Sequence, residues 1–110
     1  MTADGFRKLA LGFPGSSEGA HMGHPDFRAH GRIFATLPKE GLGMVKLTPE
    51  QQNNFVRAAP EMFQPVPGGW GRGGATTVLL KAAKTPIVRK AMGTAIENLA
   101  GKKPPRKRSK

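Results

Sequence analysis

The sequence of 110 residues contains no cysteine and no tyrosine, and it has only seven acidic residues. Without cysteine the chain forms no disulfide and offers no thiolate to a metal ion. No apolar run approaches the roughly 20 residues of a membrane-spanning helix, and the N-terminal residues lack the apolar stretch of a secretory signal. These absences favour a cytoplasmic protein that is not associated with a membrane.

Basic side chains are plentiful by contrast. The chain has 18 Lys and Arg residues, which give a formal net charge of +11. Residues 102–110 hold six of them, with no acidic residue and no apolar side chain able to pack. We therefore expect a single domain over residues 1–101, followed by a basic disordered tail over residues 102–110. The charge favours a polyanionic partner, most often nucleic acid, although a simply solvated basic surface is the alternative.

Capping residues and apolar periodicity predict three helices. Apolar residues at i, i+3, i+4 and i+7 spacing predict the first helix, over residues 2–13. A threonine cap, a proline at the first helical position and a capping box predict the second, over residues 48–59. This helix should expose Gln52 and turn Phe55 to the core. Another Thr-Pro pair starts the last helix, over residues 85–100.

Tight turns and alternating side chains predict an antiparallel sheet between these helices. The turn at residues 29–31 is the clearest, because Gly31 can take a positive φ angle. Residues 16–19 are expected to be loop, and Pro25 confines its segment to an edge strand or a bulge. The predicted strands are residues 20–28, 32–37, 44–47, 62–66 and 75–81. The fold class is therefore α+β, with one antiparallel sheet of about four to five strands and helices packed on one face.

The three histidines raise the question of a metal site. His21 and His24 are three residues apart, with Asp26 and His30 nearby, and all are types that bind metal ions. In an extended segment, which Pro25 favours, His21 and His24 would project to opposite faces. No nucleophile elbow or motif-spaced carboxylate pair is present. We expect no metal site, no cofactor and no enzymatic activity.

Five glycines fall within residues 67–74. Backbone amides of such a loop can cradle an anion, but the Lys-Ser/Thr pair of a phosphate-binding P-loop is missing. The favoured interpretation is a flexible turn with Trp70 tucked down as a plug.

Nucleic-acid binding is the leading functional hypothesis, because basic residues flank the predicted turns and a basic hairpin can straddle a nucleic-acid backbone. Such phosphate contacts supply affinity without a sequence code. The candidate contacts are Arg28, His30, Arg32, Lys39, Lys46, Arg72, Lys81 and Lys84 in the domain, and Lys102, Lys103, Arg106, Lys107 and Arg108 in the tail. The alternative is a protein- or small-ligand-binding domain that uses an open sheet face carrying Phe34, Met44 and Trp70.

Several segments in fixed order carry a family resemblance. They are Phe6-Arg-Lys-Leu-Ala-Leu11, Pro14-Gly15, Glu18, His21-Met-Gly-His-Pro-Asp-Phe27, Gly31-Arg-Ile-Phe-Ala-Thr-Leu37, Leu47-Thr-Pro-Glu50 and Phe63-Gln-Pro-Val-Pro-Gly-Gly-Trp-Gly71. Over roughly residues 5–100 the chain resembles the MmcQ/YjbR family of small bacterial proteins, often labelled DNA-binding.

The resemblance implies an α+β fold in a double-wing arrangement. The wings would be the hairpins about residues 29–31 and 38–43, or the glycine-rich loop as the second wing. The family supplies no agreed catalytic residues, and the basic tail is not part of its pattern. The oligomeric state stays open, with a monomer as the simplest expectation.

Overall fold

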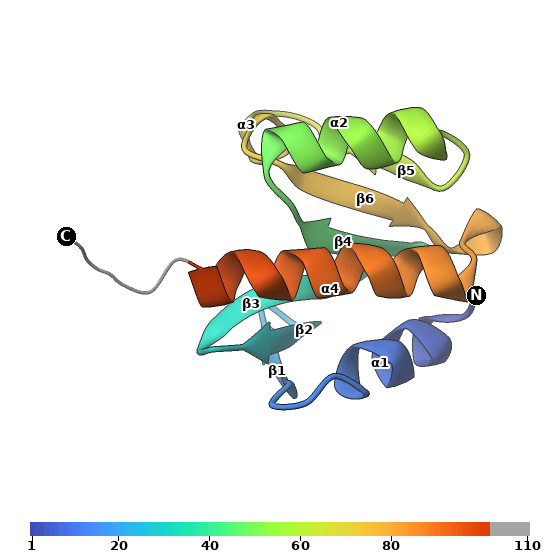
Figure 1. Ribbon diagram of the computed structural model, residues 1–110. Coiled ribbons are helices and arrows are strands. Elements are labelled where there is room, and N and C mark those ends of the chain that lie inside the picture. Colours follow the sequence, from blue (N-terminus) through green and yellow to red (C-terminus); the bar gives the residue numbers. More distant parts are fainter. Residues whose placement is uncertain (102–110) are drawn as a thin grey trace, which may run out of the picture.

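A six-stranded antiparallel sheet with strand order β1-β2-β3-β4-β6-β5 forms the centre of the structure, a computed structural model that describes residues 1–101 (Figure 1). The strands are β1 (Ser17–His21), β2 (His24–Ala29), β3 (Arg32–Lys39), β4 (Leu42–Lys46), β5 (Phe63–Pro65) and β6 (Ala75–Leu79). The helices are α1 (Ala3–Leu11), α2 (Pro49–Ala58), α3 (Gly69–Arg72), α4 (Thr85–Gly101) and the short 3-10 helix η1 (Leu80–Ala82). The predicted α+β class is confirmed, with six strands in place of four to five.

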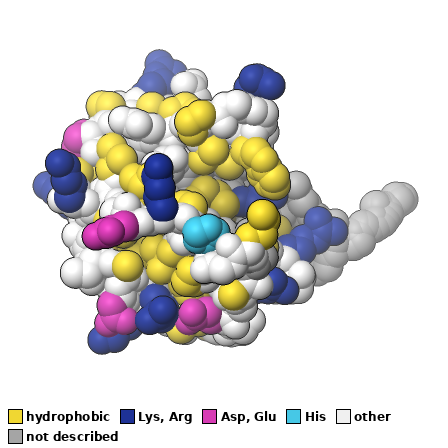
Figure 2. Space-filling view, turned by 180° about the vertical axis from the view of Figure 1, so that it is seen from behind, with side chains coloured by type: hydrophobic (Ala, Val, Ile, Leu, Met, Phe, Trp, Pro, Cys, Tyr) yellow, Lys and Arg dark blue, Asp and Glu magenta, His cyan; other side chains and the backbone are white. Residues whose placement is uncertain are grey.

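Three helices, α1, α2 and α4, lie on one face of the sheet (Figure 1). Four phenylalanines, Phe6, Phe27, Phe34 and Phe63, are fully buried in the core of this layer. The rings of Phe6 on α1 and Phe27 on β2 lie 6.1 Å apart, which joins the first helix to the sheet. None of the helices within residues 1–101 is long and apolar enough to cross a membrane. Figure 2 shows the opposite face, where hydrophobic side chains gather in the middle and Lys and Arg side chains surround them.

The strand β1 was not expected, because residues 16–19 were predicted to be loop. The chain turns back at Met22 and Gly23, whose φ angles of 52° and 80° make a two-residue hairpin turn. His21 therefore pairs with His24 across the hairpin. The prediction of one extended segment over residues 20–28 is therefore wrong, because the chain reverses direction between His21 and His24.

A β-bulge moves Phe34 away from the face on which it was predicted. Arg28 pairs with Ile33 and Phe27 pairs with Ala35, so Phe34 is an extra residue on β3. Such a bulge turns two successive side chains toward the same side. Both Phe34 and Ala35 are fully buried, and Phe34 packs edge-on against the ring of Phe13, with 6.3 Å between ring centroids. Phe34 is therefore absent from the open sheet face on which the alternative ligand-binding hypothesis places it.

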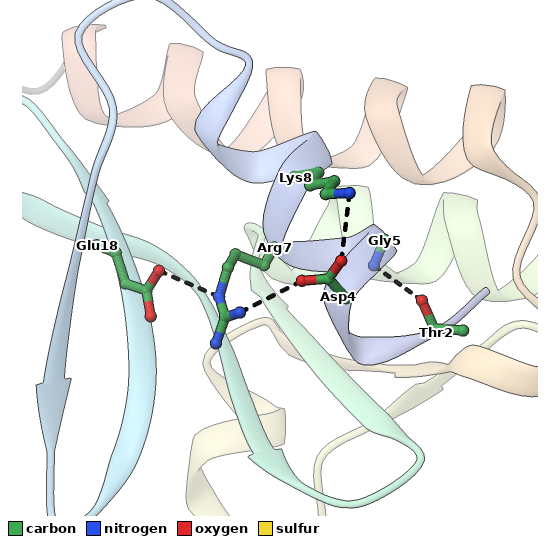
Figure 3. Close-up of polar contacts among 6 residues, drawn as sticks. All are labelled: Thr2, Asp4, Gly5, Arg7, Lys8 and Glu18. Atoms are coloured by element: carbon green, nitrogen blue, oxygen red, sulfur yellow. Dashed lines mark hydrogen bonds and ion pairs between the residues drawn. The ribbon is translucent and has the colours of Figure 1, made fainter.

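Ion pairs at the start of α1 connect this helix to β1 (Figure 3). The Thr2 side chain accepts a hydrogen bond from the Gly5 amide, as expected of a cap. Asp4 pairs with Arg7 and Lys8 on the same helix. Arg7 Nε also lies 3.2 Å from a carboxylate oxygen of Glu18 on β1. Because exposed pairs contribute little free energy, this contact orients the first hairpin more than it stabilises it.

The helix α2 begins with the predicted capping box. The Thr48 side chain accepts from the Gln51 amide at 3.2 Å, and the Gln51 side chain accepts from the Thr48 amide at 3.0 Å. Gln51 also bonds to Asn98 on α4 through its side chain. The cap therefore fixes where α2 begins and how it meets the end of α4.

We expect Thr48→Ala to lower the free energy of unfolding by about 1 kcal/mol, because the substitution leaves an amide of the first turn without its partner. Thr48→Ser keeps the accepting oxygen and should retain most of the stability. Urea unfolding followed by circular dichroism would measure both. Equal midpoints for the two variants would contradict the capping role.

Candidate nucleic-acid interface

The glycine-rich segment does not tuck Trp70 into the protein. Residues 69–72 form the single helical turn α3, and the Trp70 side chain is 72% exposed. The predicted plug is therefore wrong. Gly71, the next residue, is the buried one, and a Cβ atom there would overlap the carbonyl group of Val66. The backbone of α3 packs inward, and the indole ring projects outward.

Gln52 holds this turn in place. Its side-chain amide donates to the carbonyl oxygens of Gly71 at 2.9 Å and Ala75 at 2.8 Å. Gln52 is buried, although the sequence predicted it to be exposed. The reason is that α2 turns a different stripe toward the core: Gln52, Phe55, Val56 and Ala59, which follow the i, i+3, i+4 and i+7 spacing. This spacing could have predicted the buried stripe from the sequence. Gln52 occupies its first position, and a polar side chain there favours the interpretation that the position is exposed.

Trp70 lines two hollows. The larger, of about 640 Å³, is lined by Arg28, Arg32, Met44, Lys46 and Trp70 among others. The smaller, of about 490 Å³, is lined by Lys46, Trp70 and the nearby glycines. Lys46 and Trp70 therefore border both. We call the patch made by Arg32, Lys46 and Trp70 the Trp70 surface.

Sheet topology explains why these cations meet. The strands β2 and β4 end where β3 begins, so Arg28, Lys46 and Arg32 come to the same end of the sheet. In the part of the chain that the structure describes, no acidic residue lines either hollow. Within residues 1–101, neither Arg32 nor Lys46 forms an ion pair with an acidic side chain, and both are exposed. Their positive charge is therefore available to a ligand.

Arg28 is engaged within the protein. Its guanidinium donates to both carboxylate oxygens of Asp26, at 2.8 and 3.1 Å, and Asp26 is fully buried. The hydrogen bonds to Asp26 and its negative charge raise the pKa of Arg28, so the guanidinium stays charged at any physiological pH. Arg28 lines the larger hollow with its charge largely balanced by its partner.

The remaining predicted contacts are spread over the molecule. His30 and Arg72 are exposed, on the β2–β3 turn and on α3. Lys39, Lys81 and Lys84 are exposed at the opposite end of the sheet, where the Leu80 amide donates to the Gly41 carbonyl at 3.0 Å. Leu42, the pairing partner of Lys39, lies about 13 Å from Lys46 along β4. The structure therefore divides the predicted basic residues between two ends.

The predicted tail contacts, Lys102, Lys103, Arg106, Lys107 and Arg108, lie outside the described residues. The helix α4 ends at Gly101, and Asn98 and Leu99 in its last turn line the larger hollow. The last turn of α4 therefore lies beside the Trp70 surface.

Comparison with known families settles what kind of domain this is. The YjbR family model matches residues 11–93, which is most of the chain. The chain belongs to the YjbR family. This confirms the resemblance carried by the sequence, and the match takes in α2, α3 and the whole sheet.

A solved structure shares the YjbR fold seen here. The crystal structure of Deinococcus radiodurans protein DR2400, described as a DUF419 domain, superposes with a TM-score of 0.70 at 18% sequence identity. The similarity covers 93% of this chain and 80% of that one. No curated protein matches the chain. At this identity the comparison supports the fold alone.

The metal-site question concerns the described side chains, which do not include that of His21. Among them there is no group of three or more His, Asp or Glu side chains placed to hold a metal ion. His24 and His30 are both exposed, and they lie at opposite ends of β2, His24 as its first residue and His30 in the turn that follows it. The structure adds two candidates to the nucleic-acid set: Trp70, which the sequence assigned only to the alternative open-face site, and Gln52, which bonds to the backbone on both sides of it.

Proposed function

We propose that this YjbR-family protein binds nucleic acid, with DNA as the first candidate, through backbone contacts at the Trp70 surface. The observation that carries the proposal is the pair of exposed cations Arg32 and Lys46. Among the described residues, neither forms an ion pair and no acidic residue lines the hollows that they border. The role proposed is binding without catalysis or cofactor, in the cytoplasm.

The two proposed wings are the β2–β3 turn and the glycine-rich loop. Gly31 and Arg32 from the turn, and Trp70 and Gly73 from the loop, line the same hollow. This supports the loop as the second wing in preference to the turn at residues 38–43, which lies at the other end of the sheet. A nucleic-acid strand between the wings would meet Lys46, which borders both hollows, and the charge of the predicted basic tail would add to the attraction. Each phosphate neutralised in duplex DNA adds about 0.9 to the dependence of log affinity on log salt.

The variant Arg32→Gln/Lys46→Gln should bind DNA roughly tenfold or more weakly at low salt, because a hydrogen bond to a charged group contributes about 1.5 kcal/mol. Its salt slope should fall by about 1.8. Fluorescence anisotropy with a labelled oligonucleotide, titrated at several NaCl concentrations, would measure both quantities.

The matched control is Lys39→Gln/Lys81→Gln, which removes the same charge from the opposite end of the sheet. It should leave most of the affinity and slope intact. If both double variants weaken binding equally, the interaction is diffuse electrostatic attraction and the Trp70 surface is not the site. Full-length protein with the five predicted tail contacts changed to Gln would report the contribution of the tail separately.

A second candidate function is the binding of a protein or small ligand on the open sheet face. It is favoured by Met44 and Ile33, which are half-buried in the larger hollow rather than packed in the core. Absence of nucleic-acid binding by the unaltered protein at low salt would favour this alternative.

A further inference from the structure

The exposure of Trp70 is unusual and is fixed by the structure. Among the described residues the large hydrophobic side chains that are exposed are Leu11, Met22 and Trp70, and only Trp70 borders the two hollows. Exposed tryptophan rings that are structurally fixed often contact a ligand, because leaving such a ring in water is unfavourable.

The loop that carries Trp70 is anchored on both sides. Gln52 donates to the carbonyls of Gly71 and Ala75, and the Thr76 hydroxyl donates to the Gly74 carbonyl at 2.8 Å. The Val66 amide donates to the Ala75 carbonyl at 3.0 Å, which closes the base of the loop. The ring is thus presented from a backbone that is already ordered, so a ligand does not have to supply the ordering free energy.

We propose that Trp70 is a stacking platform for an unpaired base, and that the Trp70 surface therefore takes single-stranded nucleic acid in preference to duplex. This inference rests on the proposed nucleic-acid function and specifies its substrate class. A base stacked on the indole ring would occupy one hollow. The phosphates on its two sides would lie within reach of Lys46, which borders both hollows, and of Arg32 across the larger one.

The side chains that border the two hollows favour single-stranded nucleic acid as the ligand. Bases within a duplex are already stacked on one another, so only an unpaired base can offer a free face to the ring. Stacking on an aromatic side chain combined with cations along the backbone is how proteins bind single strands without a sequence code. A partner protein with an apolar face would instead bury Lys46 without an acidic partner from this chain, which is unfavourable.

The sequence provides its own reporter for this inference. Trp70 is the single tryptophan, and the chain has no tyrosine, so tryptophan emission reports on this position alone. The full-length protein would be titrated with a 12-nucleotide thymidine oligomer, an abasic oligomer of the same length, and a duplex of the same length. We expect the thymidine oligomer to quench the emission strongly and to bind more tightly than the other two.

Two substitutions separate stacking from charge. Trp70→Ala should weaken binding of the thymidine oligomer about tenfold to a hundredfold and leave binding of the abasic oligomer unchanged. Trp70→Phe keeps an aromatic face and should retain most of the affinity. Both variants should fold, since the side chain is exposed, and circular dichroism would verify this.

The outcomes distinguish this inference from the function on which it rests. If Arg32→Gln/Lys46→Gln weakens binding of every oligomer while Trp70→Ala changes none, phosphate binding stands and the stacking platform is wrong. Equal affinity for duplex and single strand, without quenching, also overturns the platform. If none of the three oligomers binds at low salt, both proposals fail.

Discussion

Gln52→Glu is expected to lower the free energy of unfolding by about 3 kcal/mol or more at neutral pH. The wild-type amide donates to two carbonyl oxygens, those of Gly71 and Ala75, from a buried position. A carboxylate of almost the same shape has no proton to donate, and it places a negative charge against two acceptors away from water. Chemical unfolding in urea at pH 7 would measure the loss.

The same variant should show a characteristic pH dependence. Burial and the facing carbonyls raise the pKa of the introduced carboxyl above its value of about 4.3 in the unfolded chain. A raised folded-state pKa means that the protonated form is favoured in the native protein. The variant is therefore most stable, relative to the wild type, below about pH 4.3, and it loses stability as pH rises through the folded-state pKa. Once protonated, the carboxyl can donate to one of the two carbonyls.

The control for this prediction is Gln64→Glu, the same chemical change at an exposed position on β5. Its stability should differ from the wild type by no more than about 0.5 kcal/mol, with little added pH dependence. A Gln52→Glu variant that matched this control would show that the two hydrogen bonds do not hold α3.

Gly71→Ala is the second substitution with a large expected effect, a destabilisation of about 3 kcal/mol. Its cause is steric and not conformational, because residue 71 lies within the helical turn α3 and the added methyl group would overlap the carbonyl group of Val66. Val66 cannot move away easily, since its amide donates to the Ala75 carbonyl on β6. Thermal and urea unfolding would give the change in stability.

Gly73→Ala is the matched control, two residues further along the chain. Residue 73 has a φ angle of −84°, and a Cβ atom there would lie 3.5 Å from the Trp70 carbonyl oxygen, an ordinary contact. We expect a change within about 0.5 kcal/mol. Equal stability of the two alanine variants would contradict the close approach of Gly71 to Val66. Because a relaxed loop would alter the surroundings of Trp70, its emission spectrum provides a second readout for Gly71→Ala.

Local chemistry was sufficient to predict where the helices begin. Thr2 and Thr48 cap their helices through hydrogen bonds that depend on a few neighbouring residues, so the sequence pattern and the structure agree. The turn at His30-Gly31 was predictable for the same reason. His30 adopts a φ angle of 54°, which histidine tolerates better than most side chains, and glycine follows it.

The first hairpin escaped prediction because its signals are weak. Residues 17–20 have little β propensity, and the turn places Met22 at a positive φ angle that methionine seldom takes. Pairing with β2 over the full length of β1 outweighs both local preferences. Without this hairpin, residues 20–28 are predicted as one extended segment.

The candidate site was predicted in its residue types but not in its grouping. Arg32 is predictable as a basic residue beside a turn, and Lys46 as a basic residue on the outer face of its strand. The antiparallel order of β3 and β4 brings them together. The same order carries Lys39 to the far end. The outward position of Trp70 depends on contacts between α2 and the glycine-rich loop, which are far apart in the sequence. A pattern read over a few neighbouring residues cannot contain that information.

The two edges of the sheet have different consequences for self-association. On one side, β5 is only three residues long and ends in Pro65, which has no amide proton, so a further strand gains little by pairing there. On the other side, β1 is five residues long and lies three strands, about 14 Å, from β4. Two copies that joined through β1 about a twofold axis would form one continuous twelve-stranded sheet. In such a dimer the two Trp70 residues would lie far from the shared β1 edge, on opposite sides of it. Both Trp70 surfaces would stay uncovered, and two segments of one nucleic-acid chain could bind to them at once.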